Sequence, residues 1–310
     1  MMATYNGERF LVSQIESILN QENVDVTLVI HDDGSADSTC AICQEIANSD
    51  TRVRFARNAS NLGVANNFMT MLFSPDADGY DLYAFSDQDD EWFPEKLYTA
   101  AQSIKWDDCQ QPPTLYFSNI RNEWIDGDDL CMRSELEISR FRECEKAPMT
   151  LLVRNWVNGC AMVFNPQLRE LLVQHQPAYF PRIHDVWVHM VARYCGTIIA
   201  DYDTVLMRRR LTGNNVVGKT DLSISSLDEV FGIIKQLLAP SERPMTECAI
   251  LFQEQYGELI HSRYRSKIAQ FIAYKSSLGT RIALMHSKDY WLPSAKARIR
   301  MRLAMLLGFY

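Results

Sequence analysis

Residues 82–90 read Leu82-Tyr83-Ala84-Phe85 and then Ser86-Asp87-Gln88-Asp89-Asp90, so that three carboxylates follow a short apolar run. An apolar run of this length is typical of a buried strand. Carboxylates crowded at the end of a strand raise one another's pKa unless a cation lies between them. Mg²⁺ and Mn²⁺ prefer such oxygen ligands and keep positions for phosphate oxygens. The pattern therefore predicts a metal–diphosphate site, and its alternative is an acidic surface turn.

Strand and helix patterns alternate along residues 1–120. Apolar runs predict strands at residues 26–30 and 114–117, and helices are expected near residues 66–72 and after Pro94. This alternation predicts an α/β fold with a mostly parallel, Rossmann-like sheet flanked by helices. Ligands of such sheets bind at the carboxyl ends of the strands. Both Asp32-Asp33 and the 87–90 aspartates fall there, which favours a binding site over a plain turn.

The start of the chain predicts an unusually short first strand. Only Met1-Met2-Ala3-Thr4 precede the turn at Tyr5-Asn6-Gly7, whereas strands usually have five or six residues. Two explanations stay open, a native start that lies upstream and a sheet that keeps a short strand.

Composition predicts a globular protein of the cytoplasm. The chain has 310 residues, of which 47% are hydrophobic and 23% charged, and no stretch approaches the roughly 20 apolar residues of a membrane helix. No signal-peptide pattern opens the sequence. The eight cysteines are scattered, and Cys40-x-x-Cys43 lacks a second pair at zinc spacing, so we expect reduced thiols.

Charge is unevenly distributed along the chain. Residues 261–310 carry ten Lys and Arg against one acidic residue, Asp289, whereas residues 1–260 hold 21 basic and 38 acidic side chains. An acidic body with a basic tail argues against nucleic-acid binding. Such a tail suits an anionic membrane, at about 1 kcal/mol for each basic residue near the surface. We therefore expect a protein that is cytoplasmic or peripheral on the inner face of a bacterial plasma membrane.

From about residue 221 the strand–helix alternation stops and helical patterns take over. Apolar residues keep helical spacing over 227–238 and 250–260. Near the end, basic and apolar residues alternate over 296–303, which suits a strand by period, although the residue types are helix formers. A helix on a membrane surface and a helix docked on the core are both compatible with this segment.

Seven motif-like segments follow one another over about residues 2–218. They are Met2-Ala3-Thr4-Tyr5-Asn6-Gly7, Asp32-Asp33-Gly34-Ser35, Asn61-Leu62-Gly63, Ser86-Asp87-Gln88-Asp89-Asp90 with Trp92 and Pro94, Asn158-Gly159-Cys160-Ala161-Met162, His184-Asp185-Val186-Trp187, and Gly213-Asn214-Asn215-Val216-Val217-Gly218. In this order they resemble the inverting family 2 glycosyltransferases of the GT-A fold, especially their bacterial rhamnosyltransferase-like branch. The resemblance implies a GT-A domain at residues 1–220 and a helical extension at 221–310 that associates with a membrane or docks on the core.

The resemblance also assigns residues to a nucleotide-sugar site. Asp33 would accept a hydrogen bond from the base, Asp87 would lie near the ribose, and Asp89 with Asp87 would hold a divalent Mg or Mn ion. Asp90 would instead cap the next helix. The residues implied to bind the nucleotide sugar are Thr4, Tyr5, Asp33, Asn61, Asp87 and Arg210.

On the acceptor side the resemblance implies that Asp185 is the catalytic base. Inversion needs one carboxylate to take the proton of the attacking hydroxyl, and charge stabilisation at the leaving diphosphate on the opposite side. His184 would hold or tune Asp185, or be only a helix-start residue. Trp187 would stack on a sugar ring, or belong to the core.

One segment departs from the family pattern. Many relatives carry a His before the Gly-Asn-Asn stretch, but here Met207-Arg208-Arg209-Arg210-Leu211 has none. Either the metal is held more weakly with help from an arginine, whose guanidinium suits diphosphate, or this is a solvated basic loop.

The resemblance implies transfer of a sugar from a dTDP- or UDP-sugar to a lipid-linked or polysaccharide acceptor of the cell surface, and the rhamnosyltransferase-like branch points to L-rhamnose as that sugar. Two alternatives remain. A sugar-nucleotide nucleotidyltransferase also uses an α/β sheet and Mg²⁺, although residues 4–9 hold only one Gly and one Arg for a phosphate loop. A non-catalytic relative that binds nucleotide sugar would explain the missing His.

Overall fold

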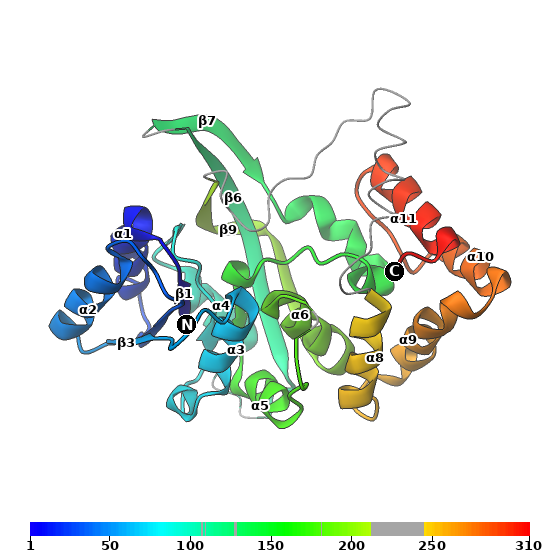
Figure 1. Ribbon diagram of the computed structural model, residues 1–310, viewed down its shortest axis with the longest axis horizontal. Coiled ribbons are helices and arrows are strands. Elements are labelled where there is room, and N and C mark those ends of the chain that lie inside the picture. The colour runs from blue at the N-terminus through cyan, green and yellow to red at the C-terminus, as the bar shows by residue number, and fades with distance from the viewer. Residues whose placement is uncertain (107, 109, 127–128, 181, 212–244) are drawn as a thin grey trace. The chain divides into compact units, whose positions relative to one another are not determined.

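The computed structural model describes residues 1–106, 108, 110–126, 129–180, 182–211 and 245–310 (Figure 1). The chain forms two compact units. The first is Met1–Arg140 with Trp156–Arg210, and the second is Phe141–Asn155 with Leu211–Tyr310. The expected boundary at residue 220, the helical pattern at 227–238 and the motif at 213–218 lie outside the described residues. The grouping of Phe141–Asn155 with the C-terminal residues was not expected from the sequence.

The first unit begins with a small parallel sheet. Its strands follow the order β1-β2-β3, and both pairs are parallel. The elements are β1 (Met2–Thr4), α1 (Glu8–Leu19), β2 (Leu28–Asp32), α2 (Thr39–Ser49), β3 (Val53–Arg57) and α3 (Val64–Phe73). Figure 1 shows α1 and α2 beside these strands, as helical crossovers between parallel strands require. The first strand is short, as expected, with three residues.

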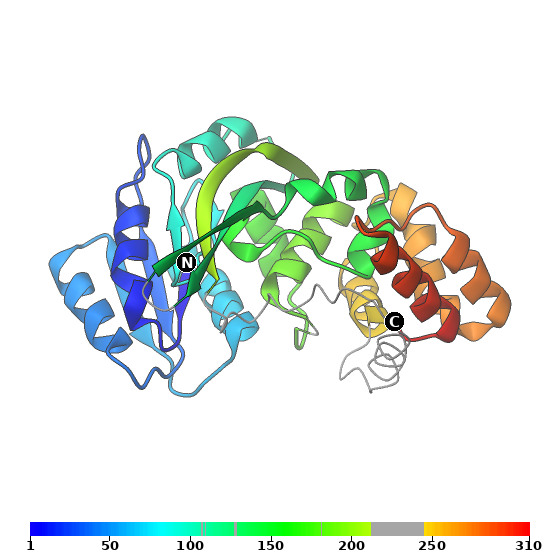
Figure 2. The same ribbon diagram turned by 90° about the horizontal axis from the view of Figure 1, so that it is seen from above.

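A second sheet continues the unit. It has six strands in the order β4-β8-β6-β9-β5, with β7 paired to β6, and the long strands β6 and β9 are clear in Figure 2. The elements are β4 (Tyr83–Ala84), β5 (Asp90–Trp92), α4 (Lys96–Ile104), β6 (Thr114–Asp126), β7 (Asp129–Leu136), β8 (Met162–Phe164), α5 (Pro166–Gln174), α6 (His184–Cys195) and β9 (Thr197–Leu211). A parallel bridge from Met2 to Ser86 joins it to the first sheet.

The α/β class is confirmed, but parallel pairing is less extensive than expected. The pairs β4–β8, β5–β9, β6–β7 and β6–β8 are all antiparallel. The sequence patterns indicated strands and helices but not the direction in which distant strands pair. The expected strand at 82–85 shrinks to two residues, and the expected strand at 114–117 extends to Asp126.

The core of the second sheet is formed where α4 packs on three strands. Ala100 and Ile104 of α4 lie against Tyr116, Val163 and Leu206 of β6, β8 and β9. This packing fixes the segment that precedes α4 and therefore the residues that follow β4.

A cavity of about 820 Å³ lies elsewhere, at the amino ends of β2 and β4. Its lining includes residues 23–29 and 79–84. The carboxylates singled out above belong to the carboxyl ends of the strands and do not line it. The chemistry of this cavity is therefore separate from that of the aspartates.

The second unit is helical in its described part. Its helices are α8 (Met245–Tyr256), α9 (Ser262–Ala273), α10 (Leu278–His286) and α11 (Ala295–Leu307). The alternating segment at 296–303 thus forms a helix and not a strand. A 3₁₀ helix, Pro148–Leu152, joins this unit through Thr150, whose hydroxyl donates to the Trp291 carbonyl oxygen at 3.1 Å and accepts from the Trp291 N–H at 2.8 Å. Among the described residues, no helix has the length and apolar character needed to cross a membrane.

Candidate active site at the strand ends

Asp32 anchors the turn that follows β2. Its side chain is fully buried and accepts hydrogen bonds from the Ser35 N–H at 2.9 Å and the Thr4 hydroxyl at 3.1 Å. Burial raises the pKa of Asp32, but hydrogen bonds from Cys40, Ser35 and Gly34 outweigh burial and hold its pKa below the usual value. Thr4, expected to line the nucleotide pocket, is 1% exposed. Its hydroxyl therefore holds Asp32 in place and presents no surface to a ligand.

Asp33 connects the end of β2 to the start of α3. Its carboxylate accepts from the N–H groups of Leu62 at 2.7 Å and Gly63 at 2.8 Å, and from Asn58 Nδ2 at 3.0 Å. Asn61 Nδ2 donates to the Asp33 carbonyl oxygen at 2.9 Å. Since a carboxylate offers about four acceptor positions, these three bonds leave capacity for one more donor.

Gln88 links the N-terminal loop to the acidic segment, a contact that the sequence did not indicate. Its Oε1 accepts from the Tyr5 N–H at 2.8 Å, and its Nε2 donates to the Tyr5 carbonyl oxygen at 3.0 Å. A Cβ at Gly7 would lie 2.2 Å from Gln88 Cδ, so glycine makes this approach possible. The Tyr5 side chain is 53% exposed. The contact therefore holds Tyr5 through its backbone and leaves its ring available.

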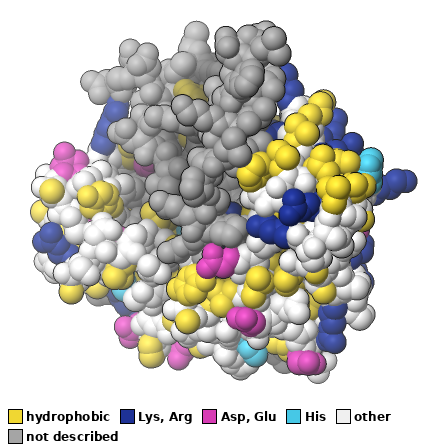
Figure 3. Space-filling view, turned by 45° about the vertical axis from the view of Figure 1, so that its right-hand side comes forward, with side chains coloured by type: hydrophobic (Ala, Val, Ile, Leu, Met, Phe, Trp, Pro, Cys, Tyr) yellow, Lys and Arg dark blue, Asp and Glu magenta, His cyan; other side chains and the backbone are white. Residues whose placement is uncertain are grey.

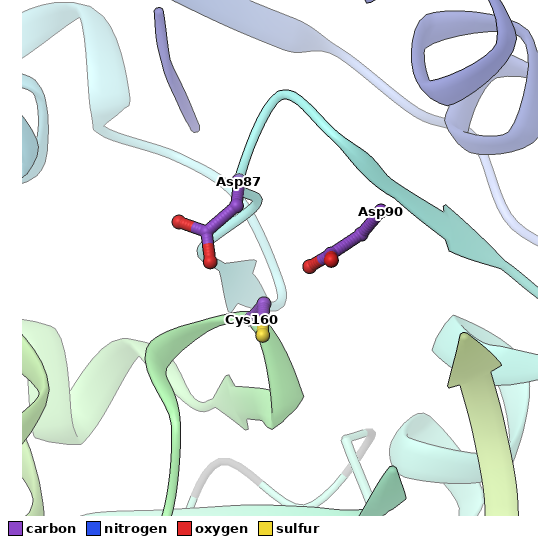
Figure 4. A group of neighbouring side chains, drawn as sticks. All are labelled: Asp87, Asp90 and Cys160. Atoms are coloured by element: carbon purple, nitrogen blue, oxygen red, sulfur yellow. The ribbon is translucent and has the colours of Figure 1, made fainter. Parts of the chain in front are cut away.

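Two aspartates of the acidic segment lie close to a cysteine from a distant part of the chain. Ligand atoms of Asp87, Asp90 and Cys160 lie within 4.8 Å of one another, and Figure 4 shows the two aspartates on the segment that runs into β5, with Cys160 next to them on a separate segment. The expectation that Asp90 caps the next helix is wrong. Asp90 lies in β5 and is fully buried, and among the described residues its two carboxylate oxygens have no N–H or O–H donor, although the weakly donating Cys160 thiol lies nearby. Asp89, the expected metal ligand, is not part of this group.

The carboxylates of this cluster are hard to ionise. Burial raises the pKa of Asp87, against the opposing charge of Arg209. Burial and the charge of Asp87 raise the pKa of Asp89 to about 6. Burial, followed by the charges of Asp87 and Asp89, raises the pKa of Asp90 well above its usual value. A cation among them would relieve both causes, desolvation and mutual repulsion.

The residues present fit a divalent cation. Two carboxylates offer the oxygen ligands that Mg²⁺ and Mn²⁺ prefer, and neither oxygen of Asp90 has an N–H or O–H donor among the described residues. Cys160 is a poorer ligand for such ions, because burial raises its pKa and keeps it a thiol.

The arginine run lies on β9 and not on a loop. The antiparallel register pairs Asp90 with Arg209 and Glu91 with Arg208. Arg210, expected to contact the nucleotide sugar, donates to the Asp90 carbonyl oxygen at 2.8 Å and pairs with the Glu91 carboxylate at 2.9 Å. The charge of the buried Arg209 lowers the pKa of Asp87, Asp89 and Asp90, and the charge of Arg210 also lowers that of Asp89. Sequence alone could have indicated this only through strand alternation, which places Arg209 on the opposite face from its two neighbours.

His184 starts α6 inside an aromatic cluster. Its ring centroid lies 4.1 Å from that of Phe68 and 4.8 Å from that of Phe85. Its Nε2 lies so close to Gly159 that a Cβ there would be 2.4 Å away. Burial lowers the pKa of His184 to about 3, so the ring is neutral at physiological pH. The structure favours a packing role for His184, and its expected role of holding or tuning Asp185 stays a prediction.

This packing locates the start of α6. His184 contacts Phe85, which comes shortly before Asp87, and Gly159, which precedes Cys160. Asp185 follows His184 in the first turn of α6. Its backbone is therefore held next to a residue that packs against both segments of the acidic cluster. Trp187 is 1% exposed and packs edge-on against Phe180. Its indole lies in the core, the alternative that the sequence had left open.

Comparison with known proteins identifies the first part of the chain. A model of the family "Glycosyl transferase family 2" matches residues 1–146. The chain is 35% identical over 121 residues to dTDP-rhamnosyl transferase RfbG of Shigella flexneri, covering 38% of this chain and 40% of that protein. It is 41% identical over 69 residues to chondroitin synthase of Escherichia coli, covering 22% of this chain and 10% of that protein. The chain thus spans less than half the length of these curated relatives.

Solved structures show the same fold. TarS 1–349 of S. aureus, in complex with UDP-GlcNAc, matches with a TM-score of 0.55 and 16% identity, over 99% of this chain and 90% of that one. TarS 1–349 in complex with UDP matches with a TM-score of 0.52. At this identity the likeness concerns the fold alone. Together with the family match over residues 1–146 and the similarity to RfbG, it confirms the resemblance expected from the sequence, which is to the family 2 glycosyltransferases of the GT-A fold and their rhamnosyltransferase-like branch.

Proposed function

We propose that the protein is an inverting glycosyltransferase that moves a sugar from a nucleotide diphosphate donor to a cell-surface glycan or lipid-linked acceptor. The observation that carries this proposal is the presence of two separate carboxylate sites in one unit. The cluster at Asp87 and Asp90 is one, and Asp185 at the start of α6 is the other. The packing of His184 on Phe85 and beside Gly159 supports their placement at the same edge of the sheet.

Asp185 acts as the general base. Its carboxylate takes the proton of the acceptor hydroxyl while that oxygen attacks the anomeric carbon. The bond from this carbon to the nucleotide diphosphate oxygen breaks on the opposite face, so the configuration inverts.

The donor nucleotide binds where β1 and β2 end. Asp33 accepts the imide N–H of a uracil or thymine base with its remaining acceptor capacity, while its other bonds keep it rigid. The exposed ring of Tyr5, fixed through Gln88, lies against the nucleotide, and Asn61 shapes the turn below it. The RfbG relative is named for a dTDP-rhamnosyl donor and TarS was solved with UDP-GlcNAc, so we propose dTDP-L-rhamnose first and UDP-sugars second.

Asp87 and Asp90 would hold a divalent cation, with Asp89 beside them. When bound, the cation supplies positive charge for the departing diphosphate. Arg209 contributes a fixed positive charge to the same place, and its charge already lowers the pKa of Asp87 and Asp89. The chain thereby compensates for the absence of the additional His ligand expected in many relatives.

The acceptor and location complete the proposal. A lipid-linked or polysaccharide acceptor would be met at the inner face of the bacterial plasma membrane, and the basic residues 261–310 provide peripheral contact with that surface. No contact with nucleic acid is proposed, because residues 1–260 carry a large excess of acidic side chains.

The substitution Asp185→Asn tests the catalytic assignment. It removes the base and almost no volume, so transfer should fall by at least about a hundredfold while the dissociation constant for donor nucleotide stays nearly unchanged. Product formation with dTDP-L-rhamnose and a lipid-linked acceptor pool measures the first effect, and calorimetry measures the second. Asp81→Asn, an exposed carboxylate of the same unit, serves as the matched control. Near-normal turnover of the Asp185→Asn variant would show that the base lies elsewhere.

Calorimetry with UDP and dTDP, with and without Mn²⁺, separates the alternatives. Glycosyltransfer predicts nucleotide diphosphate binding that Mn²⁺ strengthens. A nucleotidyltransferase would instead release pyrophosphate from a nucleoside triphosphate and a sugar phosphate. Nucleotide binding without any transfer in the donor screen would favour the non-catalytic relative.

A further inference from the structure

The outer face of α11 carries an apolar row. Ile299, Leu303 and Leu307 follow one another at intervals of four, so they lie along one face of the helix. Their side chains are 60%, 45% and 50% exposed. The opposite face, with Met301, Ala304 and Met305, is buried. We call the three exposed residues the α11 stripe.

Basic side chains border the stripe. Lys296 and Arg302 are exposed on the same helix, one on each side of the row. Arg298, by contrast, faces inward, where its Nη1 donates to the Leu292 carbonyl oxygen at 2.6 Å and its guanidinium lies 5.4 Å from the Trp291 ring centroid. Figure 3 likewise shows hydrophobic side chains lying next to Lys and Arg side chains on one face of the molecule. The helix therefore combines an inner anchor with an apolar outer face between positive charges.

We propose that the α11 stripe is the surface on which the protein docks to an anionic lipid membrane. Three large aliphatic side chains in a row on the surface indicate an interaction site, and charge identifies the partner. Ten basic residues and one acidic residue occupy positions 261–310. That acidic residue, Asp289, is engaged by Lys267 at 2.6 Å. The α11 stripe and its basic borders therefore complement a surface that is both negatively charged and apolar.

A membrane interface can accommodate both the apolar row of α11 and the basic side chains beside it. A helix lying in the interface buries its apolar face several ångströms deep, while the long stems of Lys and Arg let their charges reach the lipid headgroups. The thirteen residues of α11 are too few to cross a bilayer, so the helix lies flat. The inference deepens the membrane contact of the proposed function and rests on it, but not on the transfer reaction.

Vesicle binding by the full chain tests the proposal. Wild-type protein should cosediment with phosphatidylcholine vesicles that contain about one-third phosphatidylglycerol, bind pure phosphatidylcholine more weakly, and be released by high salt. The combined change Ile299→Ser, Leu303→Ser and Leu307→Ser should weaken partitioning at least about tenfold. The double variant Ile250→Ser and Leu259→Ser, at two positions each 41% exposed but outside the stripe, should bind as wild type does.

Charge variants provide a second, gentler measurement. Lys296→Gln with Arg302→Gln leaves the apolar row intact and should weaken binding to anionic vesicles about fivefold for each charge removed. These changes lie on the surface, so they decide the question even if the triple variant fails to fold. Equal binding by wild type and both variant sets would overturn the proposal. So would dimerisation that the triple variant abolishes without vesicle binding, because the face would then join two copies.

The two proposals fail separately. Asp185→Asn protein should bind vesicles like wild type, since the base lies in the other unit. Loss of transfer with retained vesicle binding, or the reverse, shows which proposal is at fault.

Discussion

Gln88 holds the loop on which donor recognition is proposed to depend. Because its side-chain amide bonds both the N–H and the carbonyl oxygen of Tyr5, Gln88→Ala removes two hydrogen bonds in a single substitution. We expect a loss of about 1–2 kcal/mol of stability and a raised KM for donor with a smaller change in kcat. Thermal unfolding and donor-dependent kinetics measure these effects. Gln174→Ala is the control, because the exposed Gln174 side chain at the end of α5 donates to Glu170 of the same helix. A KM equal to that of wild type would mean that the loop is positioned by other contacts.

His184 makes stability depend on pH. Its pKa is about 3 in the folded protein against an ordinary 6.5. Between these values the unfolded chain binds more protons, so this contribution is present above pH 6.5 and is lost as the pH falls. Lowering the pH from 7 to 5 should therefore reduce the free energy of unfolding of wild type by about 2 kcal/mol more than that of the His184→Leu variant. Urea unfolding at both pH values measures the difference.

The control for this prediction lies in the same aromatic cluster. Phe164, which packs against Phe85, has no titratable group, so Phe164→Leu should lower stability equally at both pH values. If His184→Leu retains the full pH dependence of wild type, another group must be responsible.

At the scale of elements, the turn between β3 and α3 determines how α3 begins. Gly63 has φ 75° and ψ 157°, a region open almost only to glycine. Its N–H also donates to Asp33. Gly63→Ala should cost about 1–3 kcal/mol and weaken nucleotide binding, because Asp33 loses part of its support. Differential scanning calorimetry and nucleotide titration provide the measurements.

At Gly279 an alanine should have the opposite effect on stability. It lies in the first turn of α10 and an added Cβ would meet only Ser277 Oγ at 3.7 Å. Gly279→Ala should therefore leave stability unchanged or raise it by about 0.5 kcal/mol. Equal destabilisation by the two alanines would refute the conformational explanation.

What the sequence predicted correctly at this scale is local. The strand expected at 26–30 lies at Leu28–Asp32, and the helices expected near 66–72 and after Pro94 are α3 and α4; all three follow from apolar runs and turn residues close together in the chain. What it missed depends on distant partners. The burial of Asp90 follows from its pairing with Arg209, which lies on β9, and the positioning role of Gln88 follows from Tyr5. Period and composition carry no information about such pairings.

At the scale of the whole molecule, the second unit is assembled from two separate stretches. A chain that ends at Arg210 keeps the 3₁₀ helix Pro148–Leu152 but loses the segment around Trp291 to which Thr150 is bonded. Its Met149, Leu151 and Leu152, all buried in the full chain, would become exposed. We expect this truncated chain to bind a hydrophobic dye and to self-associate. Size-exclusion chromatography with dye fluorescence measures both.

Replacing residues 141–155 with a glycine–serine linker in the truncated chain is the matched comparison. It removes the apolar side chains, so the shortened protein should become monomeric. A truncated chain that is monomeric without the linker would show that these residues are covered by the first unit.

Because the second unit is built from two stretches far apart in the chain, it cannot form until late in protein synthesis. Thr150 and Trp291 are 141 residues apart, which corresponds to about ten seconds of translation. For most of that interval the apolar residues near Thr150 have left the ribosome while the segment that covers them has not been made. The nascent chain is therefore a candidate client for chaperones at this one stretch. Slowing translation between the two segments should reduce the soluble yield without changing the stability of the finished protein.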